Sequence, residues 1–195
     1  MTQARVLADR VLPGEGLAWD ALRVGAGSIL VALCAQVALP LTWTPVPVTL
    51  QTFGVMFVAV ALGARRAALA MTLYLSAGAM GLPVFQPFGL PGAARLLGPT
   101  AGYLWAYPAA AFVTGWFAEN FSGRSVFRLV VSLVAGQSLV FLCGAAWLAA
   151  WSQLDVARAV QSGILPFLPG EVVKMALVVA TTRGLPGSHP ANTSP

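Results

Sequence analysis

The chain has 195 residues, of which 58% are hydrophobic and only 9% are charged. Ordinary soluble domains carry about 25% charged residues, so this composition excludes that class and indicates a membrane protein. The net charge of +5 is scattered over loops between apolar segments, which favours contact with anionic lipid over nucleic-acid binding.

The first 21 residues mix acids, bases, proline and glycine before any apolar run. A signal peptide has a short basic region that leads directly into an apolar one, so we interpret residues 1–21 as a cytoplasmic arm. Residues 22–183 are expected to form one membrane domain. Residues 184–195 are rich in proline, glycine and serine, which predicts a disordered cytoplasmic tail that contains the single histidine, His189.

Charged residues and Pro/Gly clusters divide the membrane domain into six apolar segments, each close to the ~17–25 residues that cross a bilayer as a helix. No alternating ten-residue pattern typical of a β-barrel is present, and backbone in lipid must satisfy its own hydrogen bonds. The predicted fold class is therefore all-α, a bundle of six transmembrane helices. The segments are Val24–Pro40, Val48–Ala64, Ala67–Pro83, Ala101–Ala118, Leu129–Trp151 and Ile164–Thr182.

The arginines predict the orientation, because basic residues in short loops collect on the cytoplasmic side. Only Arg95 and Arg158 fall in loops on the side opposite the termini, and Lys174 lies inside the sixth segment. Both termini are therefore predicted to lie in the cytoplasm, and the protein is predicted to reside in the inner (cytoplasmic) membrane. The arginines on the side of the termini are Arg5, Arg10, Arg23, Arg65, Arg66, Arg124, Arg128 and Arg183.

The loop after the first segment, "PLTWTPVPVTLQTF" (Pro40–Phe53), contains a Pro-x-Pro segment that favours extended backbone. Its threonines and Gln51 offer hydrogen bonds without charge. Trp43 has two interpretations: it stacks on a ligand, or it anchors at the membrane interface, as tryptophans commonly do.

The loop after the third segment, "GLPVFQPFGLPGAARLLGPTAGY" (Gly81–Tyr103), has too many glycines and prolines for a continuous helix and is nevertheless apolar. Such a loop needs cover, which the mouth of the bundle or a bound ligand would supply. Its one charge, Arg95, either serves a ligand or meets lipid headgroups.

The last segment, "PFLPGEVVKMALVVATTR" (Pro166–Arg183), carries Glu171 and Lys174 one helical turn apart, in a helix expected to begin near Glu171. Two interpretations are open: a self-contained salt bridge, or ligand-binding groups. Together with Arg95 these residues leave one excess positive charge. If the three converge, a small, mostly apolar ligand with one carboxylate would complement them.

No enzymatic chemistry is predicted. No segment pairs a nucleophile with a base, no phosphate-binding loop of the form G-x-x-x-x-G-K-[ST] is present, and no His or Cys spacing indicates a metal site. Cys34 and Cys143 are single thiols in apolar segments, so we expect neither a cofactor nor a metal.

Five ordered blocks resemble the BioY family, the biotin-specific S components of energy-coupling factor (ECF) vitamin transporters. The resemblance covers about residues 22–183. The blocks are "PVPVTLQTF" (Pro45–Phe53), "GARRAALAMTLYLSAGAMGLPVF" (Gly63–Phe85), "LGPTAGYLWAYPAAAF" (Leu97–Phe112), "GAAWLA" (Gly144–Ala149) and "GILPFLPGEVVK" (Gly163–Lys174).

The resemblance implies a compact six-helix bundle that holds biotin near its extracellular side, under lids formed by the loops after the first and third spans. Glu171 and Lys174 would then belong to the biotin site, with Glu171 at a position where the family usually has aspartate. Arg95 departs from the small residues common there, so its binding role is our own hypothesis. Gln86, Tyr103, Phe85 and Trp43 lie at lid positions, although core packing is a rival role for Tyr103.

The resemblance also implies partners: a transmembrane coupling protein and two cytoplasmic ATPase subunits. Ser28 and Ala32 have the small-x-x-x-small spacing that permits close helix approach. They serve either docking of the coupling protein or packing within the bundle. Alternative functions are an S component for another vitamin, a stand-alone channel or uniporter, and a structural bundle that transports nothing.

Overall fold

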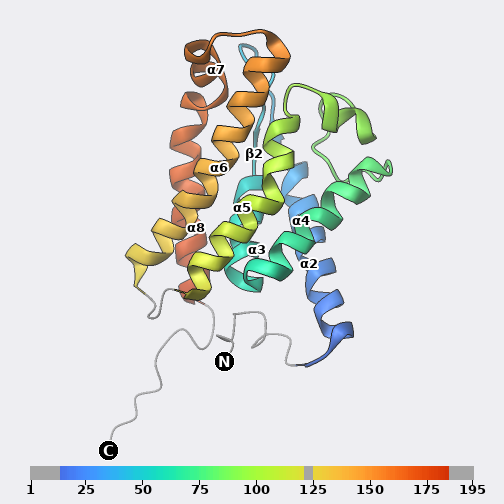
Figure 1. Cartoon of the computed structure of the whole chain (residues 1–195), viewed down its shortest axis with the longest axis vertical. Helices are drawn as coiled ribbons and strands as arrows, with labels where there is room; N and C mark the ends of the chain where they lie inside the picture. The colour runs from blue at the N-terminus through green and yellow to red at the C-terminus, as the bar shows by residue number, and fades with distance from the viewer. Residues whose placement is uncertain (1–13, 121–124, 185–195) are drawn as a thin grey trace, which may run out of the picture.

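The computed structural model describes residues 14–120 and 125–184 (Figure 1). Within these residues the chain is almost entirely helical. The helices are α2 (Leu17–Gln36), α3 (Gln51–Leu62), α4 (Ala64–Ala79), α5 (Ala101–Asn120), α6 (Val126–Ser152), α7 (Val156–Gly163) and α8 (Leu168–Gly184), with 3₁₀-helices η1 (Gly92–Leu97) and η2 (Leu165–Phe167). Strands β1 (Ala38–Leu39) and β2 (Val48–Thr49) pair antiparallel.

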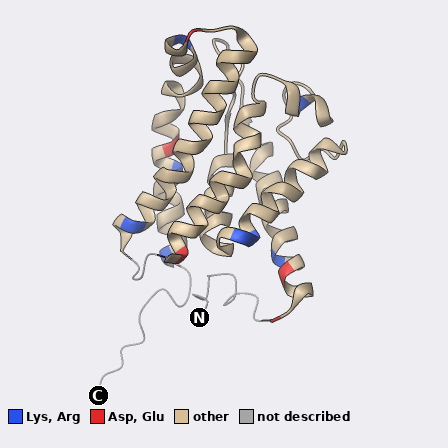
Figure 2. Ribbon diagram, viewed as in Figure 1, with Lys and Arg blue, Asp and Glu red and all other residues tan. Residues whose placement is uncertain are grey.

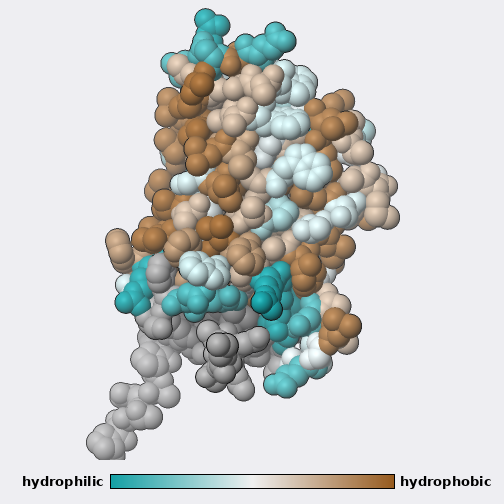
Figure 3. Space-filling model, viewed as in Figure 1, coloured by the Kyte–Doolittle hydropathy of each residue, from teal (hydrophilic) through white to brown (hydrophobic). Residues whose placement is uncertain are grey.

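Among the described residues, three helical segments are long and apolar enough to cross a membrane: Leu17–Gln36, Val126–Ser152 and Val156–Arg183, the last of which runs from α7 through η2 into α8. Gln51–Leu62 is a shorter apolar helix. Figure 3 shows brown, apolar residues along the length of the visible face and teal, hydrophilic residues at its two ends. This pattern matches the all-helical membrane class that the composition indicates.

The six predicted segments correspond to α2, α3, α4, α5, α6 and α8, and the seventh described α-helix is α7, which the sequence did not predict. Helix α7 is short and half polar, so hydropathy does not reveal it. Its start is nevertheless encoded, because the Asp155 carboxylate accepts a hydrogen bond from the backbone N–H of Arg158 at 2.8 Å, the standard capping contact at a helix N-terminus. Three of the described helical segments meet the length and hydropathy of a membrane span, so the number of six membrane-crossing helices stays a prediction.

Several helix boundaries also differ from the predicted segments. Helix α2 already begins at Leu17, within the residues predicted to form the arm, and α8 begins at Leu168 rather than near Glu171. Helices α3 and α4 are separated by Gly63 alone, whose φ of 80° and ψ of 175° suit only glycine. Most of the predicted arm and tail, with Arg5, Arg10, Arg124 and His189, lie outside the described residues.

The paired strands, the loop with η1, and helix α7 gather at one end of the bundle, which we call the loop end (Figure 1). The start of α2 and the end of α8 lie at the opposite end. Lys and Arg residues are visible at both ends in Figure 2, and one Lys/Arg and one Asp/Glu position lie between them on α8. The sequence of α8 contains Glu171 and Lys174, the charged pair of the last segment.

Helix α5 runs through the centre and packs against α3, α4 and α6. Its buried face joins the main apolar core, which includes Tyr74, Met71 and Leu148. At the loop end the indole N–H of Trp147 on α6 donates to the carbonyl of Gly98 at 2.9 Å, and Trp105 on α5 donates to the carbonyl of Leu96 at 3.0 Å. The loop that carries η1 is therefore held against α5 and α6.

Candidate functional site

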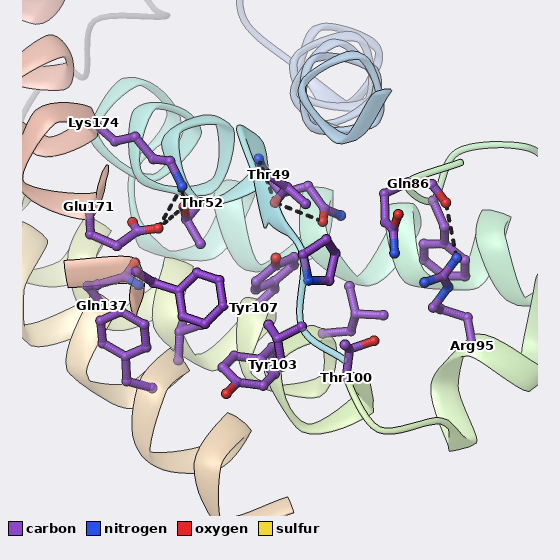
Figure 4. Close-up of a pocket in the computed structure, with 18 residues that line it drawn as sticks. Thr49, Thr52, Gln86, Arg95, Thr100, Tyr103, Tyr107, Gln137, Glu171 and Lys174 are labelled. Atoms are coloured by element: carbon purple, nitrogen blue, oxygen red, sulfur yellow. Dashed lines mark hydrogen bonds and ion pairs between the residues drawn. The ribbon is translucent and has the colours of Figure 1, made fainter. Parts of the chain in front are cut away.

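A cavity opens among α3, α5, α6 and α8 beneath the loop end (Figure 4). Its volume is about 60 Å³, and its walls are mostly apolar with a small number of polar side chains. Seven of the eight residues predicted to bind a ligand line it: Gln51, Phe85, Gln86, Arg95, Tyr103, Glu171 and Lys174. Residues far apart in the sequence thus meet around one cavity.

Glu171 and Lys174 form a buried ion pair at one end of this cavity. Their residues are 4% and 8% exposed, and Lys174 Nζ lies 2.6 Å from Glu171 Oε1. The hydroxyl of Thr52 on α3 accepts from Lys174 Nζ at 2.9 Å and donates to Glu171 Oε1 at 2.8 Å. The ammonium is therefore neutralised by the protein itself, which makes burial of the two charges tolerable.

Two polar atoms at this end have no hydrogen-bond partner among the described residues. One is Glu171 Oε2, the second oxygen of the paired carboxylate, and the other is Nε2 of Gln137 on α6, a residue that is 3% exposed. Both residues line the cavity and are drawn at the same end of it in Figure 4. One atom is an acceptor and the other a donor.

Arg95 lies at the opposite end of the same cavity (Figure 4). Its guanidinium donates to three backbone carbonyls of its own loop: Leu90 from Nε at 2.9 Å, Gln86 from Nη2 at 3.1 Å, and Phe88 from Nη2. Burial lowers the pKa of Arg95, but arginine remains protonated in proteins. The expectation that the three charges converge therefore holds only in part, because they share one cavity but occupy its two ends.

The remaining predicted lining residues are engaged with the protein. Gln51 Nε2 donates to the hydroxyl of Tyr74 at 2.6 Å, and Tyr74 packs edge-to-face against Phe85 with ring centroids 5.4 Å apart. The Tyr103 hydroxyl donates to the carbonyl of Gly163 at 2.7 Å. The side-chain oxygen of Gln86 accepts from the backbone N–H of Phe88 at 3.0 Å. These contacts shape the walls of the cavity.

Trp43 and the small-residue pair of α2 lie elsewhere. Trp43 is 68% exposed and does not line the cavity. Ser28 is buried, and Ala32 is half-buried and packs against the main core. The most exposed large side chains of α2 are those of Leu17, Ile29, Leu33 and Leu22.

A second, outer cavity of about 310 Å³ adjoins the first. Its walls come from residues 40–47 between β1 and β2, which we call the hairpin loop, and from the loop that carries η1. Pro47, Gln86, Arg95 and Thr100 line both cavities. The hairpin loop is tied to α7, because the Thr44 hydroxyl donates to the carbonyl of Ser162 at 2.8 Å and accepts from the N–H of Val46 at 3.2 Å. Thr44 thus anchors one wall of the outer cavity.

Gln137 and Thr52 are the functional candidates that the prediction of site residues missed. Gln137 is the one side-chain amide in the apolar run Leu129–Trp151, and polar groups inside membrane helices often mark functional sites. That signal was present in the sequence. The position of Thr52 opposite Lys174 depends on the packing of α3 against α8, which no local pattern shows.

Apolar helices that surround a mostly apolar cavity with few polar groups define a membrane protein with a small-molecule site. The BioY family model matches residues 5–190, nearly the whole chain. This chain therefore belongs to the BioY family.

Named relatives agree with this assignment. The chain is 37% identical over 164 residues to a protein from Thermotoga maritima named "Biotin transporter BioY", with 84% of this chain and 92% of the relative covered. It is 34% identical over 170 residues to the protein of the same name from Rhizobium etli, with 84% and 90% covered. These likenesses, with the three apolar helical segments, make the chain a multi-pass membrane protein.

The fold is also similar to a solved structure, described as the S-component for biotin from an ECF-type ABC transporter. The TM-score is 0.78 at 26% sequence identity, and the match covers 85% of this chain and 89% of the other.

Proposed function

We propose that this protein captures biotin and brings it across the membrane as the substrate-binding S component of an ECF transporter. The family, the relatives named as biotin transporters and the fold of the biotin S-component support this function. The observation that carries it is the cavity itself, with a neutralised ion pair at one end and an arginine at the other. Its role is transport rather than catalysis, with biotin as cargo and no cofactor.

The ligand requires more than the inner cavity. Small-molecule sites usually have volumes of roughly 300–1,000 Å³, whereas the inner cavity has about 60 Å³ and the outer one about 310 Å³. Arg95 lines both cavities, so it stands where they adjoin. In the proposed complex biotin extends from the ion pair to Arg95, where the inner cavity meets the outer one.

In the proposed topology six helices cross the cytoplasmic membrane, α7 lies at the extracellular surface, and both termini are cytoplasmic. Arginines at the end opposite the loop end support this, because the starts of α2, α4 and α6 and the end of α8 carry Arg23, Arg65, Arg66, Arg128 and Arg183. Basic residues concentrate on the cytoplasmic side. The loop end, where the cavity opens, then faces outward.

The proposed partners are a transmembrane coupling protein and two cytoplasmic ATPase subunits. The similar solved structure comes from an ECF-type ABC transporter, and this sequence contains no nucleotide-binding loop of its own. Energy for uptake is therefore supplied by other chains.

Direct binding tests the function. The purified protein in lipid nanodiscs is titrated with biotin, thiamine and riboflavin by isothermal titration calorimetry. We expect saturable one-to-one binding of biotin alone. Preferential binding of either other vitamin would change the assigned substrate, and absence of saturable binding to all three would overturn the proposal.

Removing the Thr44 anchor should speed biotin release. Thr44→Val keeps the shape of the side chain but removes the hydrogen bond to Ser162, worth about 1 kcal/mol, which predicts a dissociation rate about fivefold faster. A chase of bound radiolabelled biotin measures this rate. Thr42→Val, at an exposed threonine of the same loop, serves as the control, and equal rates in both variants would show that the anchor has no gating role.

Docking of the coupling protein is the proposed role of Ser28 and Ala32, although both face the core in the isolated chain. We expect Ala32→Leu to keep biotin affinity within about twofold while uptake in cells that express the whole transporter falls at least about tenfold, the scale of a disrupted helix contact. Ile29→Ala, at an exposed position of α2, is the matched control. Loss of binding and uptake together would assign the pair to packing within the bundle.

A further inference from the structure

The buried pair formed by Gln137 and Glu171 is the feature of the cavity that the protein leaves incompletely satisfied. Gln137 Nε2 and Glu171 Oε2 have no partner among the described residues, although both side chains are more than nine-tenths buried. A buried donor or acceptor without a partner is costly. Two such atoms at one end of a cavity therefore favour a ligand that brings both an acceptor and a donor.

Lys174 and Thr52, at the same end, do not share this need. Lys174 Nζ has Glu171 Oε1 and Thr52 as partners, and Thr52 has Glu171 Oε1. What remains is one acceptor on α8 and one donor on α6, in two residues that line the same cavity. The ligand edge that fits them has its own acceptor beside its own N–H.

We infer that Gln137 is a specificity-determining residue that donates from Nε2 to the ureido oxygen of biotin, while Glu171 Oε2 accepts from a ureido N–H. This inference rests on the proposed function. The ureido group has one carbonyl oxygen between two N–H groups in a rigid ring, so it presents both chemistries side by side. No assignment from the sequence includes Gln137.

The carboxylate of biotin does not fit this end. An ionised carboxylate only accepts hydrogen bonds, so it would satisfy Gln137 but meet the unpaired oxygen of Glu171 with a like charge. The net charge of the Glu171 and Lys174 pair is zero, whereas Arg95 carries a positive charge at the other end. The ureido ring therefore lies between α6 and α8, and the carboxylate points towards Arg95.

The test uses a ligand pair that differs at the ureido oxygen. In 2-iminobiotin this oxygen is replaced by an imino nitrogen, and at neutral pH the cyclic guanidine is protonated and has only N–H donors, so it no longer accepts from Gln137 while its ring N–H groups still donate to Glu171. Affinities of biotin and 2-iminobiotin are measured by calorimetry for the wild type and for Gln137→Met, which keeps the side-chain length but has no donor. The preference is the ratio of the two dissociation constants.

We expect the wild type to prefer biotin strongly, and Gln137→Met to reduce this preference about tenfold or more, chiefly by weakening biotin. Ser138→Ala, at the exposed neighbouring position of α6, should leave the ratio unchanged. A residue that merely supports packing would weaken both ligands equally, and that outcome overturns the inference.

The wild type alone supplies a second test if Gln137→Met does not fold. Desthiobiotin keeps the ureido group and should bind better than 2-iminobiotin, whereas equal affinity of the wild type for biotin and 2-iminobiotin would refute the role of Gln137. Failure of the wild type to bind biotin at all would instead refute the proposed function. The two failures are therefore distinct.

Discussion

Replacing Lys174 by methionine is expected to weaken biotin binding at least about 30-fold, because truncating one partner of a buried, hydrogen-bonded charge pair costs roughly 2–5 kcal/mol. Methionine keeps the length of the side chain but removes the ammonium, which leaves the Glu171 carboxylate buried with Thr52 alone. Calorimetry in nanodiscs measures the affinity, and thermal unfolding in the absence of biotin measures the accompanying loss of stability.

A double variant separates binding from stability. Glu171→Gln combined with Lys174→Met removes both charges, so no unpaired charge remains buried, and we expect its melting temperature to recover most of the loss caused by Lys174→Met alone. Biotin affinity should stay low, because the acceptor carboxylate is gone. Arg158→Ala, at an exposed ion pair on α7, is the surface control. A Lys174→Met protein that binds biotin within about threefold of the wild type would contradict a role of the pair in the site.

Arg95→Gln is expected to weaken biotin binding by about 30-fold or more, equivalent to roughly 2 kcal/mol. The guanidinium holds the carbonyls of Gln86, Phe88 and Leu90, so its loss releases a wall of both cavities. It also removes the positive charge proposed to face the carboxylate of biotin. Both effects lower affinity, and calorimetry with biotin measures their sum.

Biotinamide distinguishes the two effects of Arg95, which are to hold its loop and to supply a positive charge. This analogue has a neutral amide in place of the carboxylate, so a released loop weakens it as much as biotin, whereas a lost charge interaction affects biotin alone. We expect biotin to lose about tenfold more than biotinamide, since hydrogen bonds to charged groups contribute about 1.5–3 kcal/mol. Equal losses would reduce Arg95 to a loop anchor, and Arg158→Gln provides the control for an arginine at the same end of the bundle.

The helical membrane class and most of the helices could be predicted because lipid imposes strong constraints on composition and segment length. The prediction was wrong where those constraints are weak. Helix α7 is short and half polar, and its start depends on one capping contact of Asp155. The boundary between α3 and α4 is set by the backbone conformation of a single residue, Gly63, which hydropathy does not encode.

The site could be predicted in part because buried charges and amides are rare in apolar segments and therefore conspicuous. This reasoning located Glu171, Lys174 and Gln51 at the cavity, and applied to Gln137 it would have added that residue. Charge alone did not reveal that Arg95 occupies the end opposite the ion pair, because the separation depends on packing: η1 packs against α4 and α5, whereas α8 packs against α3 and α6. For Trp43 the residue type was not informative, because an aromatic ring does not indicate whether the side chain faces a cavity or the surface.

The contacts of Arg95 have a consequence for which substitutions its loop can tolerate in this chain. The guanidinium holds its loop through main-chain oxygens alone, and every amino acid supplies such an oxygen. Substitutions of Phe88 and Leu90 would therefore keep the hydrogen bonds that their backbone carbonyls accept from Arg95. Both residues border the outer cavity, so substitutions at these two positions would change the walls of that cavity without removing the backbone hydrogen bonds of Arg95.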